Sequence, residues 1–126
     1  MNDNTLLLRQ IHPSFIQHDR VTSQVFRPTP KDEKRLSVYG GDQIKPQEAW
    51  THYTDTLGFE STGVMGVTVA ECAGLSLPVN PEPERFPEHA VIDFADFEKK
   101  QIETKAKQLK ACAVTRNWLY RETVGA

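Results

Sequence analysis

The amino-acid sequence predicts one α+β domain over residues 1–126, in which a mostly antiparallel sheet of four to six short strands carries two main helices packed on one face. Three observations predict this fold class. The chain has 126 residues, of which 38% are hydrophobic, and this suits one compact core. Short apolar runs that end at proline or glycine indicate strands. The last third of the chain carries the apolar repeat of an amphipathic helix.

Three strands are predicted in the first third of the chain. Residues 5–11 form a short apolar run that is followed by a His-Pro pair, and the residue before a proline favours extended backbone. Residues 20–27 alternate loosely and stop at Pro28, which predicts an edge strand. Residues 36–39 run into Gly40 and predict a third, short strand.

The centre of the chain predicts a helix followed by a buried strand. Residues 42–58 form the helix, because Pro46 suits a first helical turn and Gly58 is a stop signal. Residues 63–69 alternate small and branched side chains, which is typical of a buried strand. Residues 70–75 then predict one or two further helical turns.

A proline-rich connection separates this part from the end of the chain. Proline fixes φ and removes a backbone donor, so the segment is predicted to lack regular structure and to run over the surface. Its length of about a dozen residues suggests a role in binding. The prolines that define it are Pro78, Pro81, Pro83 and Pro87.

The last elements are a strand, a long helix and a short final strand. Residues 89–94 alternate cleanly and predict a strand. The helix that follows repeats apolar residues on one face, which predicts a lid over the sheet. Residues 118–120 predict the final strand. The apolar face of the helix consists of Ile102, Ala106, Leu109 and Ala113.

Charge and composition exclude several classes of protein. Fifteen Lys and Arg stand against seventeen Asp and Glu in an interspersed pattern with a net charge of −2, so nucleic-acid binding is not predicted. The longest apolar run is far shorter than the roughly 20 residues that span a bilayer, and the N-terminus lacks a signal peptide. Cys72 and Cys112 lack disulfide-scaffold spacing. We therefore expect a soluble, cytoplasmic protein with reduced thiols and no membrane partner.

No catalytic or cofactor motif is found in the sequence. The four histidines have no metal-ligand spacing, and the chain lacks a Cys-x-x-Cys pair and a phosphate loop, so no metal or cofactor is predicted. Cys112 lies on the apolar side of its helix, and Cys72 follows an acidic residue that disfavours a thiolate. A serine triad would require Ser23 or Ser37 to meet a histidine, either His52 or His89, and a carboxylate. No nucleophile-elbow sequence surrounds either serine, so no catalytic residue is predicted.

One pattern predicts a ligand site. Each predicted strand contains a polar residue among apolar neighbours, and these residues would line a polar concavity if they shared one face of the sheet. Arginine offers a bidentate fork and serine and histidine add hydrogen bonds, so the set would hold an anion or a partner's carboxylate. The alternative is a wet sheet face without a ligand. The predicted ligand-binding residues are Arg9, Arg20, Ser23, Ser37 and His89.

Two functions follow from this sequence. The first is a protein-binding or accessory, immunity-like module without catalysis, whose sheet face or proline-rich connection docks on another protein. The second is a small enzyme or ligand-binding domain that holds a small anionic ligand on the polar sheet face. The missing catalytic signatures favour the first function, and the polar residues in the strands favour the second.

Overall fold

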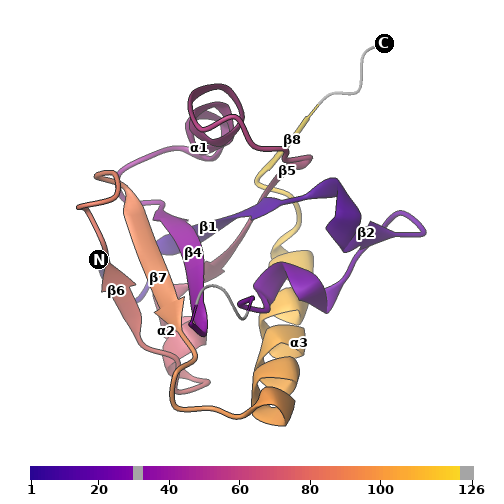
Figure 1. The fold of residues 1–126 in the computed structure, drawn as a ribbon, viewed down its shortest axis with the longest axis vertical. Helices are drawn as coiled ribbons and strands as arrows, with labels where there is room; N and C mark the ends of the chain where they lie inside the picture. The colour runs from indigo at the N-terminus through magenta and orange to yellow at the C-terminus, as the bar shows by residue number, and fades with distance from the viewer. Residues whose placement is uncertain (30–32, 123–126) are drawn as a thin grey trace.

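The computed structural model describes residues 1–29 and 33–122, and it contains a six-stranded sheet in which every neighbouring pair is antiparallel (Figure 1). This confirms the predicted α+β class. Strands β1 and β5 pair along their full length, from Leu6 opposite Thr68 to Ile11 opposite Gly63. In sheet order the strands are β6 (Val79–Pro81), β7 (His89–Asp93), β4 (Arg35–Gly40), β1 (Leu6–Ile11), β5 (Gly63–Thr68) and β8 (Tyr120–Arg121).

One face of the sheet is covered by the long helix α3 (Lys99–Arg116). Its buried residues are the four that the apolar repeat predicted, so the lid assignment is confirmed. The helix ends at Asn117, whose φ of 76° is one that L-residues rarely adopt. From the sheet, this core contains Leu7, Ile11, Leu36, Val38, Met65, Val67, Ala90 and Ile92.

The opposite face is covered by helix α1 (Pro46–Thr51), which continues into a π-helical turn (His52–Thr56). Successive strand residues point to opposite faces, and Leu7 packs with α3 whereas Leu8 packs with Ala49 of α1. The prediction that both main helices pack on one face is therefore not confirmed. Figure 1 shows α1 at the top of the view and α3 at the bottom, with the strands between them. The consecutive leucines of β1 supply apolar side chains to both faces.

The predicted strand over 20–27 is wrong beyond its first two residues. Arg20–Val21 forms β3, which pairs with β2 (Ile16–Gln17) in a separate ribbon. The 3-10 helix Ser23–Phe26 follows, and it buries Val25 and Phe26 fully in the α3 core. A tight turn can bury two consecutive side chains on one side, whereas a strand would have pointed them to opposite faces.

The proline-rich connection is also more regular than predicted. Its first part forms β6, an edge strand that pairs Val79 with Ile92 and Pro81 with Ala90 of β7. Proline is tolerated on an edge strand because its missing N–H need not face a neighbouring strand. The remainder of the connection returns to β7 and is held by the Glu82 N–H, which donates to the His89 carbonyl at 2.8 Å.

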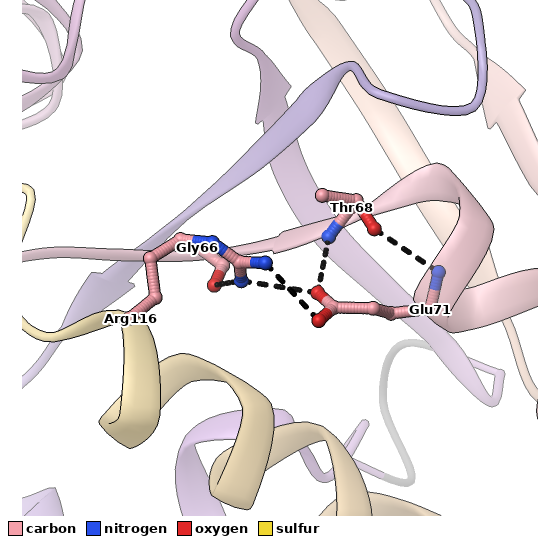
Figure 2. Close-up of polar contacts among 4 residues, drawn as sticks. All are labelled: Gly66, Thr68, Glu71 and Arg116. Atoms are coloured by element: carbon pink, nitrogen blue, oxygen red, sulfur yellow. Dashed lines mark hydrogen bonds and ion pairs between the residues drawn. The ribbon is translucent and has the colours of Figure 1, made fainter.

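A charged clamp joins the end of α3 to the strand β5 and the short helix α2 (Val69–Ala73) (Figure 2). The guanidinium of Arg116 donates to both carboxylate oxygens of Glu71, at 3.0 and 3.1 Å, and to the carbonyl of Gly66 at 2.9 Å. Glu71 also closes a capping box with Thr68 at the start of α2. The clamp therefore ties three elements together through one arginine.

Across residues 1–29 and 33–122, none of the helices combines the length and the apolar character that crossing a lipid bilayer requires.

Candidate functional site

Two adjoining cavities open on the sheet face that carries α1. The larger has a volume of about 240 Å³ and the smaller about 200 Å³. They share three lining residues, Ser37, Arg85 and His89. We call these two cavities together the Ser37–His89 cavity.

Ser37 and His89 come from the neighbouring strands β4 and β7. The register places Tyr39 opposite His89 and Ser37 opposite Val91, so Ser37 and His89 point to the same face. The Oγ atom of Ser37 lies 3.2 Å from Nε2 of His89. The histidine is only 3% exposed, and this burial fixes its ring beside the serine.

Glu82 lies on the other side of the His89 ring. Its Oε1 atom is 3.4 Å from Nδ1 of His89, and its Oε2 atom is ion-paired with Arg35. Nδ1 of His89 is buried and makes no hydrogen bond within the described part of the chain. The imidazole therefore stands between a serine hydroxyl and a carboxylate, as in a serine triad, but without the hydrogen bond from Nδ1 to the carboxylate that a triad has.

The charge state of His89 suits a proton acceptor. Burial lowers the pKa of His89 below its ordinary value of 6.5, and the nearby cations Arg85 and Arg35 lower the pKa further, whereas Glu84 opposes them. The ring is therefore neutral at pH 7. The carboxylate beside Nδ1 favours the tautomer with the proton on Nδ1, which leaves Nε2 free to accept the Ser37 hydroxyl proton.

Aromatic rings form one wall of the cavity. Phe86 contacts three rings, those of Tyr39, His52 and His89, with centroid distances of 5.0, 4.9 and 4.9 Å. The Tyr39 hydroxyl lies 2.8 Å from Nδ1 of His52. Burial, reinforced by the neighbouring Tyr53, raises the pKa of Tyr39, so its phenol stays protonated at physiological pH. This wall therefore offers ring surface from Phe86 and Tyr39 beside the imidazoles of His52 and His89.

The mouth of the cavity exposes two large apolar side chains. Phe59 is 53% exposed and its ring lies 5.2 Å from that of Tyr53, and Leu57 is 37% exposed. Both residues line the larger cavity. They follow the π-helical turn, which thereby brings apolar surface to the edge of the site.

Arg9 supports the site from the opposite face. Alternation along β1 places its side chain with Leu7 and Ile11, in the direction of α3. Its Nε atom donates to the carbonyl of Val25 at 2.7 Å, and its Nη1 atom donates to the carbonyl of Ser37 at 2.9 Å. The arginine also borders the larger cavity. It therefore anchors the backbone of Ser37 to the 3-10 helix on the other side.

Arg20 and Ser23 lie elsewhere. Arg20 is in the β2–β3 ribbon and lines a different cavity with Lys110 and Trp118. Ser23 begins the 3-10 helix on the α3 side of the sheet. Of the five predicted ligand residues, the structure brings Ser37 and His89 together, adds Arg9 behind them, and leaves Arg20 and Ser23 outside this cavity.

The proline-rich connection supplies three residues of the site that were not singled out from the sequence. Glu82, Arg85 and Phe86 lie between β6 and β7, and backbone hydrogen bonds from Glu82 to His89 and from His89 to Phe86 close this turn over the cavity. The length of the connection pointed to a binding role. Pairing its first residues with the next strand would have placed it above Ser37 and His89.

Within the described residues, no group of three or more His, Cys, Asp or Glu side chains is arranged to hold a metal ion. Comparison with protein-family models, with curated protein sequences and with solved structures finds no match to this chain.

Proposed function

We propose that the Ser37–His89 cavity binds a small anionic ligand with one aromatic or apolar ring. The observation that carries this proposal is the convergence of Ser37, His89 and Arg85 on a cavity with an aromatic wall. Ligand sites in proteins are concavities in which a few convergent polar groups fix the orientation of the ligand, and Ser37, His89 and Arg85 are such groups here.

Each lining group has a chemical task in this proposal. The exposed guanidinium of Arg85 supplies the positive charge and a planar fork that matches a carboxylate. The Ser37 hydroxyl adds a hydrogen bond. Phe86 and Tyr53 provide ring surface. The larger cavity is below the ~300–1,000 Å³ of typical ligand pockets, which favours a ligand with one ring.

Binding of benzoate tests this function. We expect benzoate to perturb the NMR signals of Ser37, Arg85 and Phe86, and the neutral isostere benzamide to bind at least about tenfold more weakly, a difference of roughly 1.4 kcal/mol. Arg85→Gln should abolish the preference for benzoate. Arg20→Gln is the matched control, because it removes one positive charge from a different cavity. Equal binding of benzoate and benzamide, or unchanged binding by Arg85→Gln, would exclude an anion site here.

Docking of a partner protein is the second proposed function. The exposed side chains of Leu57 and Phe59 at the cavity mouth support it, because exposed apolar residues that rim a polar site often mark an interface. Native mass spectrometry of protein purified gently from its own source should show a heavier species that contains a second polypeptide. A Phe59→Ser variant should lose that species, and its persistence would remove this surface as the docking site.

We also propose that the protein works in the cytoplasm. Free Cys72 and Cys112 support this location, because thiols stay reduced there. Burial raises the pKa of Cys72 to about 12, so this thiol is unreactive. Cell fractionation tests the location, and recovery of the protein only from an oxidising compartment would contradict it.

A further inference from the structure

Residues 1–29 and 33–122 contain two close serine–histidine pairs, which differ in burial and in their acidic neighbours. Ser14 Oγ lies 2.8 Å from Nδ1 of His12, but this pair is exposed and its histidine has no acidic partner among the described residues. Ser37 and His89 are further apart, at 3.2 Å, but they line a cavity and Glu82 stands behind the histidine. Catalytic pairing requires the second environment, since a base must be oriented and partly shielded from water.

The orphaned nitrogen of His89 points to a function for Glu82. A buried polar atom without a hydrogen bond is costly, yet Nδ1 of His89 faces a carboxylate at 3.4 Å. A small reorientation of the Glu82 carboxylate would convert this contact into a hydrogen bond from Nδ1–H. Catalytic hydrogen bonds commonly tighten in this way only when a substrate is bound.

We infer that Ser37, His89 and Glu82 form a nucleophilic relay that hydrolyses small esters in the Ser37–His89 cavity. This inference rests on the proposed function, because the same cavity would hold the substrate and the same Arg85 would face its oxygen atoms. It adds a reaction and a substrate class: an ester whose acyl or leaving group is a single ring or a short apolar chain.

The first half of the reaction is acylation of the serine. Ser37 Oγ attacks the carbonyl carbon of the ester, and its proton passes to Nε2 of His89 while Glu82 stabilises the imidazolium. The tetrahedral oxyanion then collapses, the bond between the carbonyl carbon and the leaving oxygen breaks, and His89 returns the proton to that oxygen. The products of this half are an alcohol and an acyl group on Ser37.

The second half is hydrolysis of the acyl-serine. Water attacks the carbonyl carbon and gives its proton to His89, and the bond to Ser37 Oγ breaks as the proton returns to the serine. A carboxylic acid leaves, so the net reaction consumes one ester and one water. Arg85 is the cation that lines both parts of the cavity with Ser37, and its guanidinium is suited to stabilise the oxyanion in each half.

Covalent labelling of the full chain tests the relay. Diisopropyl fluorophosphate reacts with an activated serine, which forms a bond to phosphorus and releases fluoride. Intact-mass measurement and peptide mapping should show one adduct, on Ser37. Ser37→Ala should abolish the adduct, whereas Ser14→Ala should label like the unaltered protein. Labelling of Ser14 in preference to Ser37, or absence of a Ser37 adduct, would overturn the inference.

Variants of the other members separate their roles. His89→Gln should slow labelling by about 100-fold or more, because the general base is lost. Ser37→Ala and His89→Gln should both lose the burst of p-nitrophenolate that we expect when the unaltered protein reacts with p-nitrophenyl acetate. Thermal unfolding of each variant shows whether it is folded. A folded His89→Gln protein that labels at the unaltered rate would exclude the histidine as the base.

Glu82 is a positioning residue in this scheme, so its test is a pH profile. His89 is faced by the cations Arg85 and Arg35 and by the carboxylates of Glu82 and Glu84. The labelling rate should rise with pH as His89 loses its proton. Glu82→Gln should move the midpoint to lower pH and Arg35→Gln should move it to higher pH. Glu82→Gln and Arg35→Gln both break the Arg35–Glu82 ion pair. If they did not shift the midpoint in opposite directions, the positioning role of Glu82 would be excluded.

The two proposals for this cavity fail separately. Benzoate binding without a Ser37 adduct would leave the ligand site in place and remove the relay. A Ser37 adduct without benzoate binding would support the relay and remove the anionic ligand.

Discussion

The two faces of the sheet have different compositions. The α3 face buries a continuous set of mostly aliphatic side chains from four strands, two helices and the 3-10 helix, together with the rings of Phe26 and Phe94. The apolar cluster under α1 has four buried residues, Leu8, Tyr39, Ala49 and Val64, and partly buried aromatic rings and the Ser37–His89 cavity surround it. In this small domain one face of the sheet supplies most of the apolar packing, and the other face retains polar groups and a cavity.

The largest effect should come from the packed face. Leu109→Ala removes a fully buried side chain at the centre of the α3 contact, and we expect it to lower the free energy of unfolding by about 2–5 kcal/mol. Chemical denaturation measures this loss. An unchanged midpoint would mean that α3 is not the lid of the core and that the α3 face does not supply most of the packing.

The clamp at the end of α3 should have the next largest effect. Arg116→Met keeps the length of the side chain but leaves Glu71 without its charged partner, and we expect a loss of about 1.5–3 kcal/mol. Burial alone would raise the pKa of Glu71, but hydrogen bonds from Arg116 and from the Thr68 N–H outweigh it, so the pKa is lowered. The clamp is therefore stabilising above pH 4.5 and weakens as the pH falls through the lowered value.

The lowered pKa of Glu71 can be tested with the same variant through the pH dependence of stability. The Arg116→Met protein should lose less stability than the unaltered protein when both are taken from pH 7 to pH 3.5. A parallel decline in the two proteins would assign the acid sensitivity to other carboxylates.

A smaller, pH-dependent effect should come from the cavity face. The pKa of His89 is lower in the folded protein than its ordinary value of 6.5, chiefly because the ring is buried. The unfolded chain therefore binds a proton at a pH where the folded protein does not. Stability from this group is complete above pH 6.5 and declines as the pH falls below it. Urea unfolding at pH 7.5 and 5.5 should show a smaller difference for His89→Gln, and an equal difference would refute this assignment.

The smallest effect should come from the mouth of the cavity. Phe59→Ser alters a side chain that is 53% exposed, and we expect the free energy of unfolding to change by less than about 0.5 kcal/mol. Thermal unfolding measures it. A loss as large as that of Leu109→Ala would show that the α1 face also carries packing essential to the fold.

Much of the sheet could be predicted from the sequence, because apolar periodicity reports burial directly. The strands 5–11, 36–39, 63–69 and 89–94 lie within one or two residues of β1, β4, β5 and β7. The helix α3 was predicted with its buried face. The predicted strand 20–27 was wrong because its alternation is weak. Val25 and Phe26 are both buried in the α3 core, which a 3-10 helix allows and a strand does not.

The site was less predictable, because it depends on which strands are neighbours. Ser37 and His89 were identified as polar residues among apolar ones, but only the pairing of β4 with β7 brings them together. Arg9 was expected on the same face, and alternation along β1 places it on the other. Glu82 stands seven positions before His89 and reaches it through the hairpin of β6 and β7. The prolines of this segment predicted irregular structure, so the hairpin was not expected.

The two edges of the sheet have a consequence for behaviour at high concentration. An exposed edge strand offers unpaired backbone groups on which a second chain can add a strand, and this is a common route to aggregation. Here one edge is β6, which has three residues and ends in Pro81, and the other is the two-residue β8. Neither strand is long enough to serve as a template for edge-to-edge growth. We therefore expect little edge-to-edge self-association through this sheet, even though its central strands are rich in valine and leucine.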